Sequence, residues 1–427
     1  MTAIVGTINR RGVAFAADSA ATHTISSKHK ITNHANKIFE LSKYHPVGIA
    51  LCGNLDFLGL PWEDIIKMFR SKIKRRGYRT LKEYSEAFFT FIRTSIMSTL
   101  QNDQKRNLEI VVNGFLNEIV TLSRKELEEK ELEVKDETMF PLFIEKLDYF
   151  EDVYKGKEVN EEFSSYTLDK FKAYSNEMVC RLLSPITSNP LCPVDLKDKF
   201  VKSLYCIIIS QIHVYLVNTE LVFWGYGDDE IFPSYYSYVI SSAFDDRIKK
   251  TLKSQYVVSN DRVACVEPFA QTDVANTVVR GIDADLRMKF YESYNASITM
   301  FRDEIVSKLE SAGAPEKLKE VLIALDMNAY TKTFVDGMDA YIQENYIQKL
   351  VDTVAYLSKE DLADMAESLV RMTYLKRRIT SEEESVGGPV DVAVITKGDG
   401  FVWLKRKHYF EAELNPHFFE RSKLIRL

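Results

Sequence analysis

Short apolar runs separated by polar turns predict β-strands at both ends of the chain. Near the N-terminus, apolar runs at 2–8 and 13–18 flank the polar stretch Asn-Arg-Arg-Gly, a pattern typical of a β-hairpin. Runs at 37–41 and 46–53 predict two further strands joined by a short polar link. Close to the C-terminus, residues 387–407 contain two β-rich runs around Lys-Gly-Asp-Gly, which predicts another hairpin.

Between these strands the spacing of apolar residues is helical. At 61–73 they recur every three or four positions, and Pro61 suits the first turn of a helix. A helical pattern also covers almost all of 271–380, where Ser358 and Asp361 come close to a capping box. Further helices are expected at 80–100, 108–132, 163–186 and 196–214.

These elements predict one β-rich core that is built from both ends of the chain and carries long helical insertions. The terminal hairpin is too small to be stable alone, and apolar runs at 221–227 and 263–269 would add strands to the core. The alternative is two unrelated domains, each with its own sheet. In chain order we expect the first core segment at 2–60, a helical part with the first insertion at 61–215 and core strands at 216–270. A second helical insertion at 271–356 and the last helix and hairpin at 357–427 would follow.

Composition narrows the class of protein. The 427 residues carry a formal net charge of −6, so no basic footprint suggests nucleic-acid binding. The most apolar stretch, 203–217, is interrupted by Gln211 and His213 and is too short to span a bilayer. The N-terminus lacks the apolar region of a signal peptide. We expect a cytoplasmic protein that binds neither nucleic acid nor membranes.

The residues that commonly bind metals or cofactors show no recognised spacing. The five cysteines are odd in number and widely spaced, without a C-x-x-C pair, which favours a reducing compartment over disulfides or structural zinc. Neither phosphate-binding glycine motif occurs. His23, His29 and His34 fall in a stretch that we interpret as a polar loop. We therefore expect no metal and no cofactor.

Two other groupings each allow a functional and a structural interpretation. The Gly-rich turn at 225–233 holds three carboxylates that could bind Mg²⁺ or Ca²⁺, although a loop leading into a helix is the simpler interpretation; they are Asp228, Asp229 and Glu230. The Tyr-rich segment that follows is then expected to be helical. Cys52 and His45 could form a nucleophile pair, but a cysteine buried in a strand is commoner.

The first residues allow one specific chemistry. If Met1 is removed, Thr2 carries both a hydroxyl nucleophile and a free α-amine that can act as its base. The unperturbed pKa of such an amine is about 7.7–8.0, close to the working pH. A cation beside it would lower the pKa of both groups, and a carboxylate would hold that cation in place. Lys37 and Asp18, at predicted strand ends, are candidates for these roles.

The first part of the chain contains the motif T-x-I-V-G…G-V-x-x-A-A-D-S-x-x-T, followed by K-I-F-E-L and G-I-A-L-C-G-N-L-D. This motif resembles the opening of proteasome β-subunits and of the bacterial HslV-type peptidase. The resemblance is specific over about the first 60 residues and looser over 357–404, and it suggests a long bacterial-type variant with helical insertions. In CGNLD, Gly53 resembles the family's oxyanion donor, with Cys52 as the alternative register. The other matching positions are Thr2, Gly12, Asp18, Ser19, Thr22 and Lys37.

The resemblance implies an α+β fold, the four-layer αββα sandwich of N-terminal nucleophile (Ntn) hydrolases, with two antiparallel sheets between helices. It also implies a threonine-type endopeptidase in which Thr2 attacks the substrate carbonyl, Lys37 supplies positive charge, Asp18 orients Lys37, and the Gly53 amide stabilises the oxyanion. A peptide or protein substrate and a homo-oligomer, such as a ring, are the implied partners. An ATP-dependent unfoldase as a further partner is left open.

The chain departs from the family pattern in three ways. Tyr226 occupies the place of a serine that helps the proton shuttle; its hydroxyl could substitute, or the ring could simply pack. Before the Gly-Gly pair, Glu383 and Ser385 could replace the family's Asp-x-x-Ser with a shift of one residue, or belong to a solvated acidic loop. The chain is also much longer than a usual β-subunit. A catalytically inactive scaffold or ring-forming protein is therefore the alternative to an active hydrolase.

Overall fold

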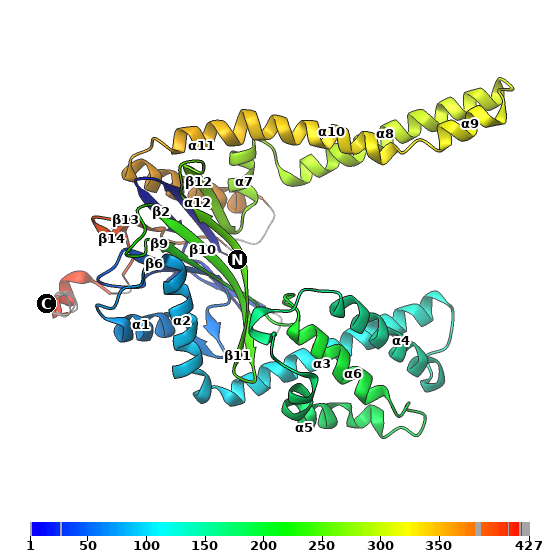
Figure 1. Cartoon of the computed structure of the whole chain (residues 1–427), viewed down its shortest axis with the longest axis horizontal. Helices are drawn as coiled ribbons and strands as arrows, with labels where there is room; N and C mark the ends of the chain where they lie inside the picture. Colours follow the sequence, from blue (N-terminus) through cyan, green and yellow to red (C-terminus); the bar gives the residue numbers. More distant parts are fainter. Residues whose placement is uncertain (1, 26–27, 381–385, 409, 418–419, 421–427) are drawn as a thin grey trace. The chain divides into compact units, whose positions relative to one another are not determined.

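The computed structural model describes residues 2–25, 28–380, 386–408, 410–417 and 420. The chain divides into two compact units, Met1–Lys37 with Val257–Leu427, and Ile38–Tyr256. Each unit contains a five-stranded sheet (Figure 1).

The sheet of the first unit joins strands from both ends of the chain. Its order is β12-β1-β2-β13-β14, and all neighbouring strands are antiparallel. Both predicted terminal hairpins form, and Asp391 of the C-terminal hairpin pairs with Ala17 of the N-terminal one. The strands are β1 (Ala3–Asn9), β2 (Gly12–Ala17), β12 (Ala264–Ala270), β13 (Asp391–Thr396) and β14 (Gly400–Lys405).

Helix α12 (Lys359–Ile379) packs on β1 and β2 through small and branched side chains. Its start is fixed by the predicted capping box, in which the side chains of Ser358 and Asp361 accept each other's backbone N–H groups. The Thr7 hydroxyl also donates to the Leu362 carbonyl oxygen at 2.8 Å, which fixes the helix on the sheet. The shared core includes Ala3, Val5, Ala14, Ala16, Leu362, Ala366 and Val370.

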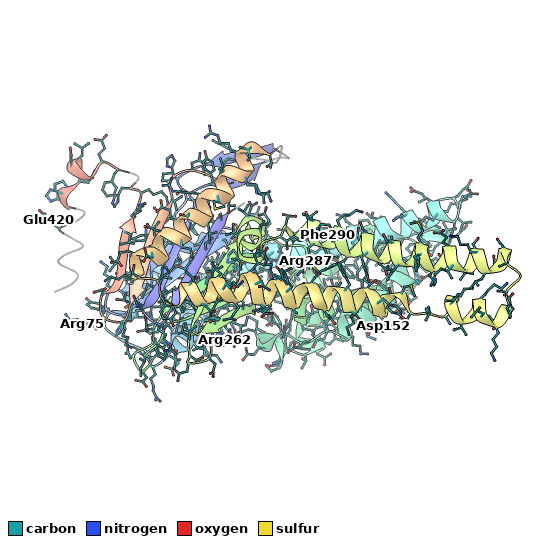
Figure 2. All side chains as sticks on the ribbon, turned by 90° about the horizontal axis from the view of Figure 1, so that it is seen from above. Arg75, Asp152, Arg262, Arg287, Phe290 and Glu420 are labelled. Atoms are coloured by element: carbon teal, nitrogen blue, oxygen red, sulfur yellow. The ribbon has the colours of Figure 1, made fainter. Side chains whose placement is uncertain are left out.

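A long helical hairpin belongs to the first unit. Helices α8 (Ala284–Ser311) and α10 (Met327–Ile342) run side by side away from the sheet, with α9 (Glu316–Ile323) at the far end (Figures 1 and 2). Few of its side chains are buried, and Phe290 of α8 is exposed. The remaining elements of this unit are α7 (Asp273–Arg280), the π-helical turn Gln343–Ile347, α11 (Gln348–Val354), the 3₁₀ turn Ala412–Leu414, and the hairpin β3 (Ala21–Ile25) and β4 (Lys28–Thr32).

The sheet of the second unit has the order β11-β10-β9-β6-β5. Helices α1 (Trp62–Ile73) and α2 (Leu81–Ser95) contribute to the same apolar core, in which Phe88 and Phe89 of α2 meet Phe223 of β9 edge to face. The strands are β5 (Ile38–Glu40), β6 (Val47–Gly53), β9 (Thr219–Gly225), β10 (Ser234–Phe244) and β11 (Arg247–Val257), with the short pair β7 (Asp56–Phe57) and β8 (Leu60–Pro61).

The second unit contains four further helices (Figure 1). They form a mostly separate apolar core around Phe115, Phe150 and Phe200. They are α3 (Gln101–Glu129), α4 (Asp136–Lys155), α5 (Leu168–Thr187) and α6 (Leu196–Ile209), with 3₁₀ turns at Met97–Thr99 and Glu161–Phe163. Helix α4 was not predicted, and α3 begins earlier than the sequence suggested.

Two other predictions of local structure were wrong. The Tyr-rich segment after residue 233 is the strand β10, which pairs antiparallel with β9; tyrosine and valine favour strands as well as apolar cores, so the helical interpretation was not the only one open. The polar stretch around His23 and His29 forms the β3–β4 hairpin. The α+β class with antiparallel sheets is confirmed. Over the described part of the chain, no helix is both long enough and apolar enough to cross a bilayer.

Candidate active site

Thr2 lies immediately before strand β1 and is 6% exposed. The antiparallel pairing of β1 with β12 places it beside Gln271, whose backbone N–H donates to the Thr2 carbonyl oxygen at 3.1 Å. The next residue, Ala3, is paired with Ala270 in the ladder. The backbone of Thr2 is therefore held by the sheet.

Asp18, the residue after β2, connects this position to its surroundings. Its Oδ1 accepts hydrogen bonds from the Ala3 backbone N–H at 2.9 Å and from Lys37 Nζ at 2.6 Å. Its Oδ2 accepts from the backbone N–H groups of Ala20 and Gly387, each at 3.1 Å. A carboxylate offers about four acceptor positions. These four donors therefore account for its full capacity.

Lys37 and Asp18 form a buried ion pair, and each side chain is 1% exposed. Removing two charges from water costs several kcal/mol per ion, which their mutual attraction does not always recover. Because the Lys37 ammonium and the Ala3 amide bond to the same oxygen, they lie within two hydrogen-bond lengths of each other. A fixed positive charge is therefore placed close to the peptide that joins Thr2 to Ala3.

Ser19 positions the segment that follows residue 386. Its backbone N–H donates to the Gly387 carbonyl oxygen at 3.0 Å, and its hydroxyl donates to the Pro389 carbonyl oxygen at 2.5 Å. Gly388 has a φ of 77°, and a Cβ there would lie 2.9 Å from the Asn33 carbonyl oxygen, so glycine is strongly favoured at this position. The role of the Gly387 amide was not predicted, although the Gly-Gly pair was a visible signal.

A second polar group near Thr2 was also missed. Arg377 of α12 donates from Nε to the Gln271 side chain at 2.7 Å and from Nη2 to Asp273 at 2.8 Å. Burial alone would raise the pKa of Asp273, but Lys376 and Arg377 outweigh this effect and lower it. Arg377 therefore supports the residue whose backbone holds Thr2. These residues lie far apart in the chain, and no motif connects them.

Two of the predicted site residues lie in the second unit. Gly53 ends β6 with a φ of 88°, and a Cβ there would lie 2.2 Å from the Asn218 carbonyl oxygen. Tyr226 is buried, its backbone N–H donates to the Pro46 carbonyl oxygen at 3.0 Å, and burial raises the pKa of its hydroxyl. The structure thus brings together Thr2, Asp18, Ser19 and Lys37 within the first unit, while Gly53 and Tyr226 are placed in the other.

Cys52 and His45 do not form a nucleophile pair. The Cys52 thiol lies 3.6 Å from Glu220 Oε2. The His45 ring nitrogens lie 3.1 Å from Asp228 Oδ1 and 3.1 Å from the Arg75 carbonyl oxygen.

The acidic turn after β9 leads into strand β10 rather than into a helix, which corrects our interpretation. Asp229 binds Arg79 at 2.7 Å, whereas Glu230 accepts the backbone N–H of Leu81 at 3.0 Å. Glu230 thus supports the start of α2, a helix that precedes the turn in the sequence.

Some predicted positions cannot be placed. Glu383 and Ser385 lie outside the described residues, as do the side chains of Thr22, His23 and His29. Across the described residues, the structure holds no group of three or more His, Cys, Asp or Glu side chains arranged to bind a metal ion.

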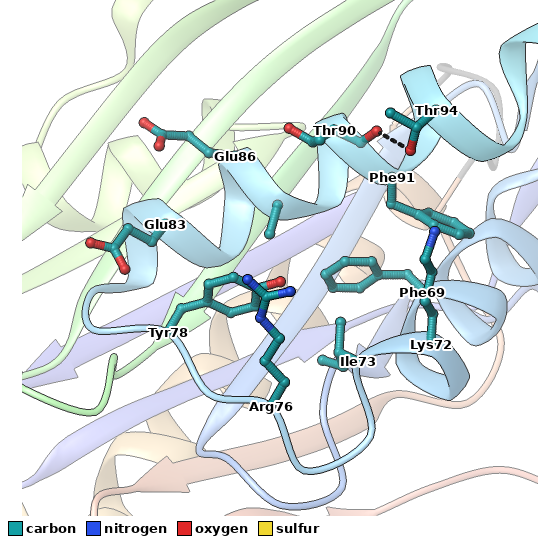
Figure 3. A pocket seen from close by; sticks show the side chains of 11 residues that line it. Phe69, Lys72, Ile73, Arg76, Tyr78, Glu83, Glu86, Thr90, Phe91 and Thr94 are labelled. Atoms are coloured by element: carbon teal, nitrogen blue, oxygen red, sulfur yellow. Dashed lines mark hydrogen bonds between the residues drawn. The ribbon is translucent and has the colours of Figure 1, made fainter.

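A pocket of about 410 Å³ lies between α1 and α2 (Figure 3). Phe69, Ile73 and Phe91 provide apolar side chains (Figure 3). The charged lining residues are Lys72, Arg76, Glu83 and Glu86. Both cations lie over aromatic rings of the pocket: the Lys72 ammonium is 5.1 Å from the centre of Phe91, and the Arg76 guanidinium is 5.2 Å from that of Tyr78. None of the residues predicted for catalysis lines this pocket.

Comparison with known proteins assigns no family. No family model matches the chain, and no curated protein matches it. Among solved structures, the Anbu (Gly-1) mutant from Hyphomicrobium sp. strain MC1 matches with 9% identity and a TM-score of 0.31, covering 100% of this chain and 95% of that one. Anbu from the same strain matches with 10% identity and a TM-score of 0.30, covering 100% and 96%.

These findings correct the sequence analysis. The resemblance to proteasome β-subunits and the HslV-type peptidase rested on short motifs, specific only over about the first 60 of 427 residues. Assigning the chain to that family as a long bacterial-type variant was wrong, because no family model matches and the two structures named above, both of Anbu, are only 9% and 10% identical.

Proposed function

We propose that the chain is a threonine-type amide hydrolase in which Thr2, exposed by removal of Met1, acts as an N-terminal nucleophile on peptides. One observation carries this proposal. A buried Lys37–Asp18 ion pair is hydrogen-bonded to the backbone amide directly after a buried Thr2. A structural role alone is weak grounds for burying two charges, because buried ion pairs often contribute little net stability. Activation of Thr2 would explain why the two charges are buried beside this residue.

In the proposed reaction, the free α-amine of Thr2 takes the proton of the Thr2 hydroxyl as Oγ attacks the carbonyl carbon of the substrate. The amine then returns that proton to the leaving nitrogen, which breaks the amide bond and leaves an ester on Thr2. Water hydrolyses the ester, releases the acid and restores the hydroxyl. The positive charge of Lys37 favours the neutral amine and the developing alkoxide, and Asp18 fixes Lys37.

The reaction needs a donor to the oxyanion, and the backbone amide of Gly53 is the candidate that the sequence supplies. The positive φ of Gly53 and the close Asn218 carbonyl oxygen show that its position requires glycine. Such a donor contributes about 3–4 kcal/mol to transition-state stabilisation. In this proposal Ser19 holds the segment around Gly387 in place, and the buried Tyr226 has a packing role in the core rather than a role in proton transfer. The proposal also includes the four-layer αββα arrangement, a cytoplasmic location and assembly into a homo-oligomer.

The first test is the state of the N-terminus. Intact-mass measurement of the purified chain should show that Met1 is absent, and a threonine-directed electrophile should form an adduct on Thr2. Thr2→Ala should abolish cleavage of a fluorogenic peptide library without changing circular dichroism, whereas Thr333→Ala, on the exposed side of α10, should change neither. Retention of Met1, or cleavage by Thr2→Ala at the original rate, would rule out this mechanism.

An inactive scaffold is the second candidate, and one observation favours it. Helix α8 exposes Met300 and Phe301, at 70% and 65%, and apolar side chains gathered on a surface are typical of interaction sites. The scaffold predicts a stable assembly by light scattering that Thr2→Ala does not alter, together with no cleavage by the original protein.

A further inference from the structure

A second, separate cavity lies among the helices of the second unit. It has a volume of about 310 Å³, within the range of small-molecule sites. Its wall comes from the end of α4, the start of α5 and the end of α6. The backbone beside it is fixed, because the Asn160 N–H donates to the Ile209 carbonyl oxygen at 2.7 Å and the Gln211 N–H to the Glu158 carbonyl oxygen at 3.0 Å.

The lining of this cavity is divided by polarity. Leu168 and Ile209, with the rings of Tyr154 and Tyr205, are partly buried and give it an apolar interior. The Tyr205 hydroxyl is already engaged, since it donates to the Tyr166 carbonyl oxygen at 2.6 Å. Its ring can therefore offer an apolar face.

Three exposed lysines, Lys155, Lys157 and Lys202, also line the cavity, with Glu151 as the one acid among the lining residues. Within the described part of the chain, none of these three ammonium groups forms an ion pair. Other lysines of these helices do form ion pairs: Lys199 Nζ lies 2.5 Å from Asp148 Oδ1. The excess of positive charge thus gathers at the cavity.

The pocket between α1 and α2 lacks this combination. There the cations lie over aromatic rings, and two glutamates line the same pocket (Figure 3). An anionic ligand would gain less from that balanced surface than from the lysine-lined cavity.

We propose that the cavity lined by Lys155, Lys157 and Lys202 binds a small amphiphilic carboxylate, with its anionic head at the lysines and its aliphatic tail against Leu168 and Ile209. Burial of the tail favours binding in proportion to the apolar surface that is removed from water. The three lysines favour a ligand whose polar head is negatively charged over one whose head is positively charged. This site is independent of the reaction proposed for Thr2.

Cys206 provides a reporter within the chain. It lines the cavity and is partly buried, which raises the pKa of its thiol. Cys180 is exposed on α5 and is not among the lining residues. An occupant of the cavity should therefore shield Cys206 from a thiol reagent and leave Cys180 unprotected.

The test measures alkylation of the full chain by N-ethylmaleimide, with peptide mass spectrometry, at increasing octanoate below its micelle-forming concentration. We expect octanoate to slow labelling of Cys206 saturably and to leave Cys180 unchanged. Octylamine should give no protection, because it places a cation against the lysines. Acetate should give none either, because it has no tail.

Variants decide whether the lysines select the anion. Lys155→Gln with Lys202→Gln should raise the half-protecting octanoate concentration about fivefold or more, the effect of losing about 1 kcal/mol of binding. Lys125→Gln, on the exposed surface of α3, should leave it unchanged. Absence of protection at millimolar octanoate, equal protection by octylamine, or an unaltered midpoint in the double variant would each overturn the proposal.

Discussion

Replacing Asp18 by Asn tests how strongly the candidate site depends on one carboxylate. The change keeps the shape of the side chain and removes its charge. Asp18 receives two donors on each oxygen: Ala3 and Lys37 on Oδ1, and Ala20 and Gly387 on Oδ2. An asparagine has one oxygen and an NH₂ group that only donates. Whichever way the amide turns, two buried donors face another donor.

The expected cost follows from these contacts. An unsatisfied buried donor costs about 1–3 kcal/mol, and breaking a buried ion pair by neutralising one partner costs about 3–5 kcal/mol. The two effects overlap, because Lys37 belongs to both. We therefore expect Asp18→Asn to lower the free energy of opening of the first unit by about 3–5 kcal/mol.

Hydrogen-exchange mass spectrometry of peptides from β1 and β2 measures this quantity locally. In the regime where exchange follows the opening equilibrium, about 1.4 kcal/mol corresponds to a factor of ten. Amide exchange in these strands should therefore accelerate more than about a hundredfold. Glu129→Gln breaks an exposed pair with Lys125 on α3 and should leave the exchange of β1 and β2 unchanged.

A double variant separates charge burial from simple loss of packing. Asp18→Asn with Lys37→Met no longer leaves a buried, unpaired ammonium. It should thus be less destabilised than the sum of the two single variants, by about 1 kcal/mol or more. A cost below about 1 kcal/mol for Asp18→Asn, or strictly additive single variants, would refute the reasoning.

Three further predictions concern positions outside the ion pair. Burial lowers the pKa of Lys249 to about 7, so the unfolded chain binds this proton more tightly than the folded chain does, and the free energy of unfolding should rise by about 1.4 kcal/mol per pH unit from pH 7 towards 10.5. In urea titrations, Lys249→Met should flatten that rise and increase the free energy of unfolding at pH 7. Burial, with a smaller effect of Lys249, lowers the pKa of His213 to about 4, so the free energy of unfolding should be highest above pH 6.5 and fall as the pH drops towards 4. His213→Gln should weaken this pH dependence, and an NMR titration of the His213 ring protons with a midpoint near 6.5 would contradict the prediction. Gly388→Ala should cost about 1–3 kcal/mol, because of its positive φ and the close Asn33 carbonyl oxygen, whereas Gly398→Ala, with no atom within 4 Å of its Cβ position, should leave the melting temperature unchanged.

Sequence patterns predicted the elements that are bounded by clear turn or capping signals. The N-terminal and C-terminal hairpins were predictable because apolar runs end at turn residues. Helix α12 was predictable because its amphipathic spacing begins at a capping box. Strand β10 was missed because its Tyr-rich segment was assigned to a helix, although tyrosine and valine also favour strands; β1 and β2 are equally buried and were predicted.

The same distinction holds for the candidate site. The sequence by itself determined that Thr2, Asp18 and Lys37 stand at the ends of local elements, since turn chemistry and short apolar runs are local properties. Only the tertiary structure decided that Gly387 donates to Asp18 and that Arg377 supports Gln271. Those contacts depend on the register of β13 against β2 and on the packing of α12 against the sheet. Register and packing are set by cooperative burial across hundreds of residues, which no local pattern encodes.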